Sequence, residues 1–97
     1  MEIIEPTKIG FTIYSKSGCP NCTKVKQLIK EKNFLFTVID SDDYIIENKE
    51  AFLQFIENKA ETSYRTFPMV FYDGKFVGGL IHTTEFIEKL LSFEDVF

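Results

Sequence analysis

The sequence contains no tryptophan, only one histidine and only two cysteines, and it has no long apolar run. A structural zinc site normally uses four Cys or His ligands, so this chain could complete one only with ligands from a second chain. No stretch approaches the ~20 apolar residues of a membrane-spanning helix. The net charge of −4 argues against a nucleic-acid-binding surface, which needs a basic stripe. We therefore expect no metal, no membrane and no nucleic-acid partner.

Ninety-seven residues, 44% of them apolar, are enough for one small domain with a hydrophobic core. We expect a single domain over residues 1–97, with a short N-terminal extension at 1–8 and a C-terminal tail at 92–97 that packs onto the body. The first residues lack the basic and then apolar segments of a signal peptide. We therefore expect the protein in a reducing compartment, the cytoplasm, where a lone Cys-x-x-Cys motif is more often catalytic or metal-binding than a structural disulfide.

The two cysteines form a Cys-Pro-Asn-Cys motif at residues 19–22, in a specific context. An apolar run that predicts a strand, residues 9–14, precedes the motif, and a helical pattern follows it. Pro20 suits the first position of a helix, which places Cys19 at or beside the N-cap. Free backbone N–H groups and the helix dipole stabilise a thiolate there, and Lys16 is a candidate for a neighbouring cation. We predict a redox pair that cycles between dithiol and disulfide.

Three other interpretations of the cysteine pair stay open at this point. A structural disulfide is one, although closing so small a loop removes little chain entropy. A zinc site shared with a second chain is another. The third is an inert pair of buried thiols, although Pro20 and Asn21 between the cysteines are typical of a surface turn.

The rest of the sequence predicts alternating strands and helices. The expected strands are 9–14, 34–39, 66–72 and 75–77, and the expected helices are 20–32, 47–59 and a last one through Leu91. Residues 34–39 carry apolar side chains on both faces, which is typical of a strand covered by helices on both sides. The order β-α-β-α-β-β-α predicts an α/β domain with a four-stranded mixed sheet flanked by three helices.

The connections between these elements carry their own signals. Residues 40–43 form a polar break, which we interpret as a solvated loop. Asp73-Gly74 predicts a two-residue hairpin between the last two strands. Thr83 or Thr84 is expected to cap the last helix.

With these motifs the chain resembles a glutaredoxin, a member of the thioredoxin-fold superfamily. Four stretches carry the resemblance in the right order, and they are Tyr14–Cys22 with the Cys-x-x-Cys motif, Arg65–Pro68, the hairpin through Asp73-Gly74, and Gly78-Gly79. The similarity covers about residues 9–91. Thioredoxins usually carry Trp before the first cysteine and Gly-Pro between the two, and this chain has neither.

The resemblance implies a role for each matching residue. Cys19 is expected to be the nucleophile and Cys22 the resolving thiol. Pro68 matches the family's cis-proline, which would present the backbone of Phe67 to the cysteinyl part of glutathione. Lys16 matches a basic residue that neighbours the thiolate and the glycine carboxylate of glutathione. The full set expected to contact glutathione is Lys16, Arg65, Thr66, Phe67, Pro68, Gly79, Leu80 and Ile81.

The chain departs from the family pattern at two places. Asn21 stands where glutaredoxins often have Tyr or Phe, which leaves that edge of the site more open and more polar. Leu80, Ile81 and His82 stand where the family usually offers a small or polar residue and then Asp to the γ-glutamyl end of glutathione. Backbone N–H groups can still bind the γ-glutamyl carboxylate, but an aspartate for its ammonium is missing. His82 is a candidate replacement contact for the carboxylate.

The resemblance implies a glutathione-dependent thiol-disulfide oxidoreductase that reduces protein disulfides and glutathione mixed disulfides through Cys19 and Cys22. Its expected partners are glutathione, disulfide-containing or glutathionylated proteins, and ribonucleotide reductase as one candidate, and we expect a monomer. Two alternatives stay open. One is a thioredoxin-like electron donor to a dedicated protein partner such as ribonucleotide reductase. The other is an iron–sulfur cluster carrier, against which Pro20 and Cys22 argue.

Overall fold

The computed structural model describes residues 2–95, with side chains from residue 2 to residue 92. Seven elements follow one another in the predicted order. The strands are β1 (Phe11–Ser15), β2 (Phe36–Asp40), β3 (Met69–Tyr72) and β4 (Lys75–Gly78), and the helices are α1 (Pro20–Glu31), α2 (Asp42–Ala60) and α3 (Leu80–Asp95). β1 pairs parallel with β2 and antiparallel with β3, which pairs antiparallel with β4, so the strand order is β2-β1-β3-β4. This four-stranded mixed sheet with three helices confirms the predicted architecture.

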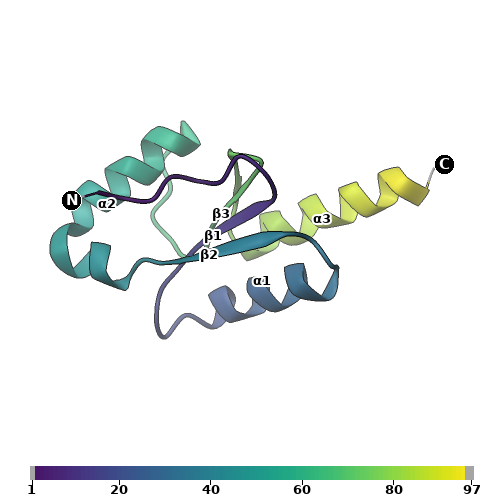
Figure 1. Cartoon of the computed structure of the whole chain (residues 1–97), viewed down its shortest axis with the longest axis horizontal. Helices are drawn as coiled ribbons and strands as arrows, with labels where there is room; N and C mark the ends of the chain where they lie inside the picture. Colours follow the sequence, from purple (N-terminus) through teal and green to yellow (C-terminus); the bar gives the residue numbers. More distant parts are fainter. Residues whose placement is uncertain (1, 96–97) are drawn as a thin grey trace.

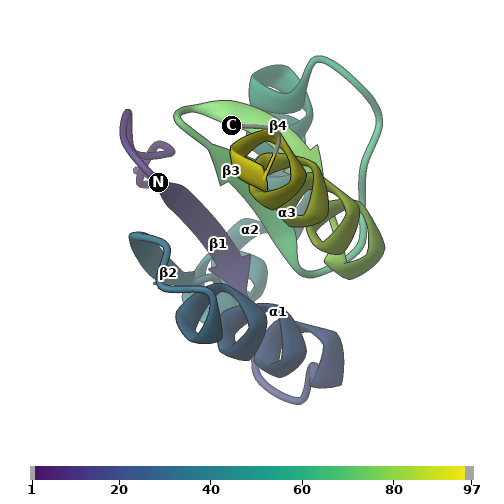
Figure 2. The same cartoon turned by 90° about the vertical axis from the view of Figure 1, so that its right-hand side faces the viewer.

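Helices cover both faces of the sheet. α2 lies on one face and α1 on the opposite face, as Figure 1 shows. α3 shares the face of α1 and contacts it (Figure 2). Alternate residues of β1 therefore face different helices: Phe11 and Ile13 point to the side of α1 and α3, whereas Tyr14 points to the side of α2. Because both faces are covered, every residue of β1 is buried, including the polar Thr12 and Ser15.

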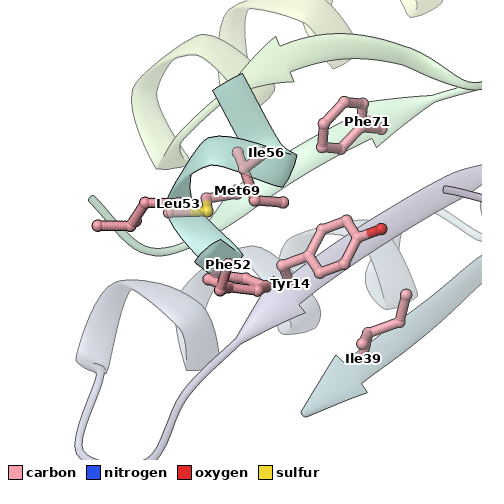
Figure 3. Packing of buried hydrophobic residues seen from close by; sticks show 7 residues of the cluster. All are labelled: Tyr14, Ile39, Phe52, Leu53, Ile56, Met69 and Phe71. Atoms are coloured by element: carbon pink, nitrogen blue, oxygen red, sulfur yellow. The ribbon is translucent and has the colours of Figure 1, made fainter. Parts of the chain in front are cut away.

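The core between α2 and the sheet is built around aromatic rings. Figure 3 shows Phe52 of α2 next to Tyr14 of β1, with Phe71 of β3 on the other side of the Tyr14 ring. Phe52 is fully buried, and its ring stacks with Tyr44 at 5.6 Å and with Phe67 at 5.9 Å between centroids. This aromatic stack of Tyr44, Phe52 and Phe67 connects the core to the loop before β3.

The edge strand β2 is less covered than its sequence predicted. It has β1 on one side and no strand on the other within residues 2–95. Leu35 is 65% exposed and Val38 is 40% exposed, so the prediction of a strand covered on both faces was wrong for these side chains. Within β2 the buried residue is Ile39, which belongs to the core under α2. The apolar pattern did not reveal that the strand lies at an edge of the sheet.

The interpretation of residues 40–43 as a solvated loop was wrong, because α2 begins at Asp42. The Asp40 side chain accepts a hydrogen bond from the backbone N–H of Asp42 at 3.0 Å. Ser41 precedes the helix and is fully buried, and its backbone N–H donates to the carbonyl of Ser15 at 2.8 Å. Acidic residues are favourable in the first turn of a helix, so the acidic run favoured a helix start as much as a loop.

A kink at Asn48 divides α2 into two parts. The Asn48 backbone is extended, and its side-chain oxygen accepts a hydrogen bond from the N–H of Ala51 at 3.1 Å. Asn48 therefore acts as an N-cap for the second part of the helix. That second part agrees with the predicted helix 47–59, whereas the first part was missed.

Asp42 also ties the start of α2 to the loop after β1. Its carboxylate accepts hydrogen bonds from the Ser17 hydroxyl and from the Ser17 backbone N–H, the latter at 2.9 Å. These bonds, with a smaller contribution from the charge of Lys16, hold the pKa of Asp42 below its ordinary value of 3.8. The loop after β1 is thus attached to α2 through one ionised side chain.

The last helix begins earlier than predicted. α3 starts at Leu80, and the backbone carbonyl of Gly79 accepts the N–H of Thr83 at 3.0 Å. Thr83 and Thr84 lie inside the helix, so neither caps it, and the Thr84 hydroxyl donates to the carbonyl of Leu80 at 2.8 Å. The glycines that end β4 are followed by the helix directly, without the short connection that the sequence suggested.

The C-terminal part of the chain continues α3 through Asp95. Figure 1 shows this helix reaching past the end of the sheet. The predicted packing of Phe93, Val96 and Phe97 onto the body lies outside the described side chains. None of the helices between residues 2 and 95 combines the length and the apolar character that crossing a membrane requires.

The N-terminal extension lies against the α2 side of the body. The Tyr14 hydroxyl donates a hydrogen bond to the carbonyl of Ile4 at 2.5 Å, and Glu5 pairs with Lys59 of α2 at 2.5 Å. Figure 1 shows the extension, in purple, running along α2. The burial of Tyr14, and to a lesser extent the neighbouring Tyr44 and Glu5, raise the pKa of its hydroxyl, which therefore stays protonated as the donor of this bond.

Replacing Phe52 tests the aromatic stack. Phe52→Ala should lower the free energy of unfolding by about 3–5 kcal/mol, because it removes a fully buried ring between two others. Ile46→Ala is the matched control, because Ile46 belongs to the same helix but is 82% exposed, and it should change stability by less than about 0.5 kcal/mol. Urea unfolding followed by circular dichroism gives both values. A similar loss in both variants would contradict the packing described here.

The pH dependence of stability tests the Asp42 contact. The folded-state pKa of Asp42 is lowered, so its carboxylate stabilises the fold above the unfolded pKa, and this contribution is lost as the pH falls through the folded pKa. The stability difference between wild type and Asp42→Asn should therefore be constant at neutral pH and shrink below about pH 4. Asp43→Asn, which changes an exposed neighbour in the same turn, should show a smaller difference. Equal pH dependence in both variants would refute the role of the Ser17 bonds.

Candidate active site

The first cysteine caps the helix that follows it. β1 ends at Ser15 and α1 begins at Pro20, so Cys19 occupies the N-cap with an extended backbone (φ −117°, ψ 97°). Its sulfur accepts a hydrogen bond from the backbone N–H of Cys22 at 3.1 Å. Pro20 stands at the start of the helix, where its missing N–H leaves no bond unmade. The predicted position of Cys19 at the N-cap is confirmed.

The two cysteines differ in their access to solvent. A disulfide joins them, with the Cα atoms 5.2 Å apart. Cys19 is half-buried, whereas Cys22 is only 1% exposed. A substrate disulfide or an attacking thiol can therefore reach Cys19 far more easily than Cys22. This asymmetry argues against an inert pair in which both thiols are buried.

Lys16 lies beside Cys19 but also contacts an aromatic ring. Lys16 and Cys19 line the same hollow of about 330 Å³, which we call the cysteine hollow and which Thr23 and Lys26 of α1 also line. The Lys16 ammonium lies 5.7 Å from the centre of the Phe67 ring, a cation–π arrangement. The aromatic stack therefore helps to determine where the Lys16 charge lies relative to the site.

A second hollow lies between the start of α1, the loop before β3 and the start of α3. It measures about 330 Å³, and we call it the cis-proline hollow. Pro68 itself is buried and follows a cis peptide bond, as the resemblance implied. Within the described chain, the backbone of Phe67 makes no hydrogen bond. Five of the residues expected to contact glutathione line this hollow, and they are Thr66, Phe67, Gly79, Leu80 and Ile81.

The two basic residues of the expected set lie in a third hollow, of about 290 Å³. This basic hollow is lined by Lys16, Lys49, Arg65 and Phe67, together with residues of α2. The structure thus divides the expected contacts between two hollows that share Phe67. It does not bring Lys16 and Arg65 into the hollow that holds the other five.

Arg65 is already engaged by carboxylates. Its guanidinium lies 2.9 Å from Glu50 and 3.3 Å from Glu57, both on α2. The hydrogen bond and charge of Glu50 and the charge of Glu57 raise the pKa of Arg65, and Arg65 in turn lowers the pKa of Glu50. Ion pairs at an exposed surface contribute little to stability, but they compete with any anionic ligand for the same guanidinium.

Two residues of these hollows were missed by the sequence reasoning. Tyr64 lines the cis-proline hollow, where its hydroxyl contacts Gly79 and its ring packs on Phe76 at 4.9 Å between centroids. Lys26 of α1 lines the cysteine hollow and donates to the Ser15 hydroxyl at 3.4 Å. The only signal for Tyr64 was an aromatic residue within a polar segment, and helical spacing alone did not distinguish Lys26 from its exposed neighbours.

The described side chains do not form a metal site. In the part of the chain that the structure describes, no three Cys, His, Asp or Glu side chains are placed together to hold a metal ion. His82, the one histidine, lines the cis-proline hollow, away from any second candidate ligand there.

Comparison with known protein sequences identifies the family. Residues 11–77 match the sequence profile of the family described as Glutaredoxin. Glutaredoxin 1 of Rickettsia typhi is 36% identical over 67 residues, which are 69% of this chain and 60% of that protein. A glutaredoxin of Vernicia fordii is 42% identical over 73 residues, which are 74% of this chain and 65% of that protein. The chain spans about three fifths of the length of the first curated relatives it matches.

Solved structures of glutaredoxins share the architecture. Glutaredoxin 1 from Francisella tularensis, crystallised with cacodylate, superposes with a TM-score of 0.72 at 28% identity, covering 84% of this chain and 95% of that one. A buckwheat glutaredoxin in complex with glutathione gives a TM-score of 0.63 at 30% identity, covering 81% and 68%. The fold is therefore the thioredoxin fold. Because the family profile matches well over half of the sequence, including the Cys-x-x-Cys pair at the start of α1, the chain belongs to the glutaredoxin family.

Proposed function

We propose that the chain is a thiol-disulfide oxidoreductase that uses glutathione as its reductant. The observation that carries this proposal is the position of Cys19. Its sulfur lies at the N-terminus of α1, accessible and with a backbone N–H directed at it, whereas Cys22 is buried three residues further on. The positive end of a helix favours an anion, so the reduced Cys19 should react as a thiolate. Membership of the glutaredoxin family supports the same activity.

The proposed cycle uses the two cysteines in turn. The Cys19 thiolate attacks one sulfur of a substrate disulfide, and the other sulfur leaves as a thiolate. Cys22 then loses its proton and attacks the Cys19 sulfur, which releases the second substrate thiolate and forms the Cys19–Cys22 disulfide. One glutathione thiolate opens this disulfide by bonding to Cys19, and Cys22 leaves as a thiolate. A second glutathione thiolate attacks the sulfur of the bound glutathione, which forms glutathione disulfide and releases the Cys19 thiolate. Two glutathione molecules therefore supply the two electrons that reduce one substrate disulfide.

The two hollows that share Phe67 suit the two ends of glutathione. The unpaired backbone of Phe67 can bond to the cysteinyl unit in the manner of an added strand. Lys16 and Arg65 line the basic hollow, and their positive charges support the proposal that this hollow binds the glycine carboxylate. Leu80 and Ile81 begin α3 beside the cis-proline hollow, and a helix N-terminus suits the γ-glutamyl carboxylate. The buckwheat relative binds glutathione, which supports this use of the site.

The proposed substrates are disulfide-containing or glutathionylated proteins. A reducing compartment such as the cytoplasm would keep the pair as a dithiol, and we propose it as the location. That ribonucleotide reductase is a partner of this protein stays a prediction from the sequence. A thioredoxin reductase that reduced the Cys19–Cys22 disulfide faster than glutathione does would favour the thioredoxin-like donor instead.

Substituting each cysteine in turn tests the proposed function. Cys19→Ser should abolish the reduction of both protein disulfides and glutathione mixed disulfides, because it removes the attacking sulfur. Cys22→Ser should abolish the first activity and spare the second, because one thiolate is enough to remove glutathione. A glutathione-coupled assay with a protein disulfide and with a glutathionylated peptide measures both. Turnover by Cys19→Ser would overturn the assignment.

The two basic residues are expected to differ in importance. Arg65 already pairs with Glu50 and Glu57, whereas no carboxylate of residues 2–92, the side chains that the structure describes, pairs with Lys16. One exposed charge contact contributes about 0–1 kcal/mol, so Lys16→Met should lower kcat/KM for a glutathionylated peptide by about threefold to fivefold, and Arg65→Met by less than about twofold. Lys24→Met, on the exposed side of α1, controls for the loss of net charge. Equal losses for Lys16 and Arg65 would refute the argument from ion pairing.

A further inference from the structure

We propose that the cis-proline hollow recognises the carboxylate of a small thiol and not its ammonium group. The site should then accept thiols that carry a carboxylate at this position without an α-amino group. This inference rests on the proposed function, because it names the class of small thiol that the same site uses.

The polar groups of the hollow carry the inference. The residues around it contribute two hydroxyls, from Tyr64 and Thr66, the amide of Asn21 and the imidazole of His82, and the remaining lining is Phe67 and residues 79–81. None of the lining residues is acidic. An ammonium group in this hollow would find neutral acceptors but no carboxylate to balance its charge, whereas a carboxylate finds several hydrogen-bond donors.

Two acidic side chains that are close in sequence to the lining residues make their contacts elsewhere. Glu57 accepts hydrogen bonds from Ser63 and from the backbone N–H of Tyr64, and it lies 3.3 Å from Arg65. Glu85 lies three residues after His82 and lines a separate groove between β4 and α3. Neither carboxylate lines the cis-proline hollow.

The His82 side chain is held against the end of β4, at one side of the cis-proline hollow. A Cβ placed on Gly78 would come within 2.8 Å of the Cβ, Cγ and Nδ1 atoms of His82, so the ring packs directly on the Gly78 backbone. Gly78 has a φ of +131°, a conformation that residues with a Cβ rarely adopt. His82 lines both the hollow and the groove beside it, so it forms the boundary between them. This boundary carries an imidazole and not a carboxylate.

Binding at the start of α3 needs only the carboxylate. The first hydrogen bond within α3 runs from Thr83 to the carbonyl of Gly79. The backbone N–H groups of Leu80, Ile81 and His82 donate to no acceptor in the described chain, as expected for the first turn of a helix. A carboxylate can accept from these groups and from the hydroxyls of the hollow. The amino group of the γ-glutamyl unit therefore gains no ion pair from the residues that line the hollow.

The test compares glutathione with its glutaryl analogue, glutaryl-cysteinyl-glycine, which has the same carboxylates and thiol but no amino group. Either thiol, used twice, reduces the Cys19–Cys22 disulfide to the dithiol and becomes a symmetrical disulfide. The reaction is stopped by alkylation, and the mass of the protein reports its two free thiols. Each rate is divided by the rate of the same thiol with hydroxyethyl disulfide, which removes any difference in intrinsic reactivity.

The wild-type protein should use the two thiols with normalised rate constants within about twofold of each other. His82→Asp should favour glutathione by about threefold to fivefold, because it supplies a carboxylate for the ammonium at a helix start where an acidic residue is tolerated. Glu85→Gln, on the same helix but in the other groove, should leave the ratio unchanged. This control also tests whether Glu85 reaches the ligand.

Three outcomes would overturn the inference. The first is a wild-type preference for glutathione above about threefold, which would mean that the site does hold the ammonium. The second is a His82→Asp variant with an unchanged ratio, which would mean that residue 82 does not face this part of the ligand. The third is a failure of both thiols to reduce the disulfide above the uncatalysed rate. This last result would also refute the proposed function, whereas a preference for glutathione would leave that function intact.

Discussion

The hydrogen bond from the Cys22 backbone to the Cys19 sulfur is the contact on which the chemistry of this protein depends. It exists because a buried strand ends and a helix begins within five residues, with Cys19 at the N-cap. Gly18 makes this turn possible with a φ of +66°, which favours glycine. The same N–H that orders the first turn of α1 can therefore also stabilise negative charge on the Cys19 sulfur, which is the attacking sulfur of the proposed cycle.

Two sets of contacts connect the α2 side of the domain to the residues around Cys19. Asp42 holds Ser17 in the loop before Cys19, and the aromatic stack ends at Phe67, whose ring faces the Lys16 ammonium. Both connections come from the α2 side of the sheet. Packing that is far from the sulfur in sequence thus fixes the loop and the cation beside it, so stability and reactivity share the same residues. The aromatic stack and Asp42 therefore support both the fold and the candidate active site.

Much of this arrangement could be predicted from sequence, because it depends on local chemistry. The N-cap position of Cys19 follows from Pro20 and the motif, and the mixed sheet follows from the order of the elements. The errors arose where the outcome depends on tertiary contacts. The acidic run 40–43 contains the start of a helix, and Asp42 accepts a hydrogen bond there from Ser17, a residue that is distant in the sequence. Arg65 lies outside the cis-proline hollow, where it pairs with two glutamates of α2. The residues next to Arg65 in the sequence give no sign of these ion pairs.

The charge of the whole chain does not describe the charge of its active site. The net charge is −4, yet Lys16, Lys26 and Lys49 line the cysteine and basic hollows together with Arg65, whose charge Glu50 and Glu57 already offset. The carboxylates that line these two hollows themselves are Asp40 and Asp42. Both aspartates accept backbone hydrogen bonds, which reduces what they can offer to a ligand. In the proposed mechanism these three lysines would attract anionic thiols and stabilise the thiolate they meet, and salt would weaken both effects. Selectivity for anionic partners can thus arise from where three lysines lie, even though the net charge of the chain is negative.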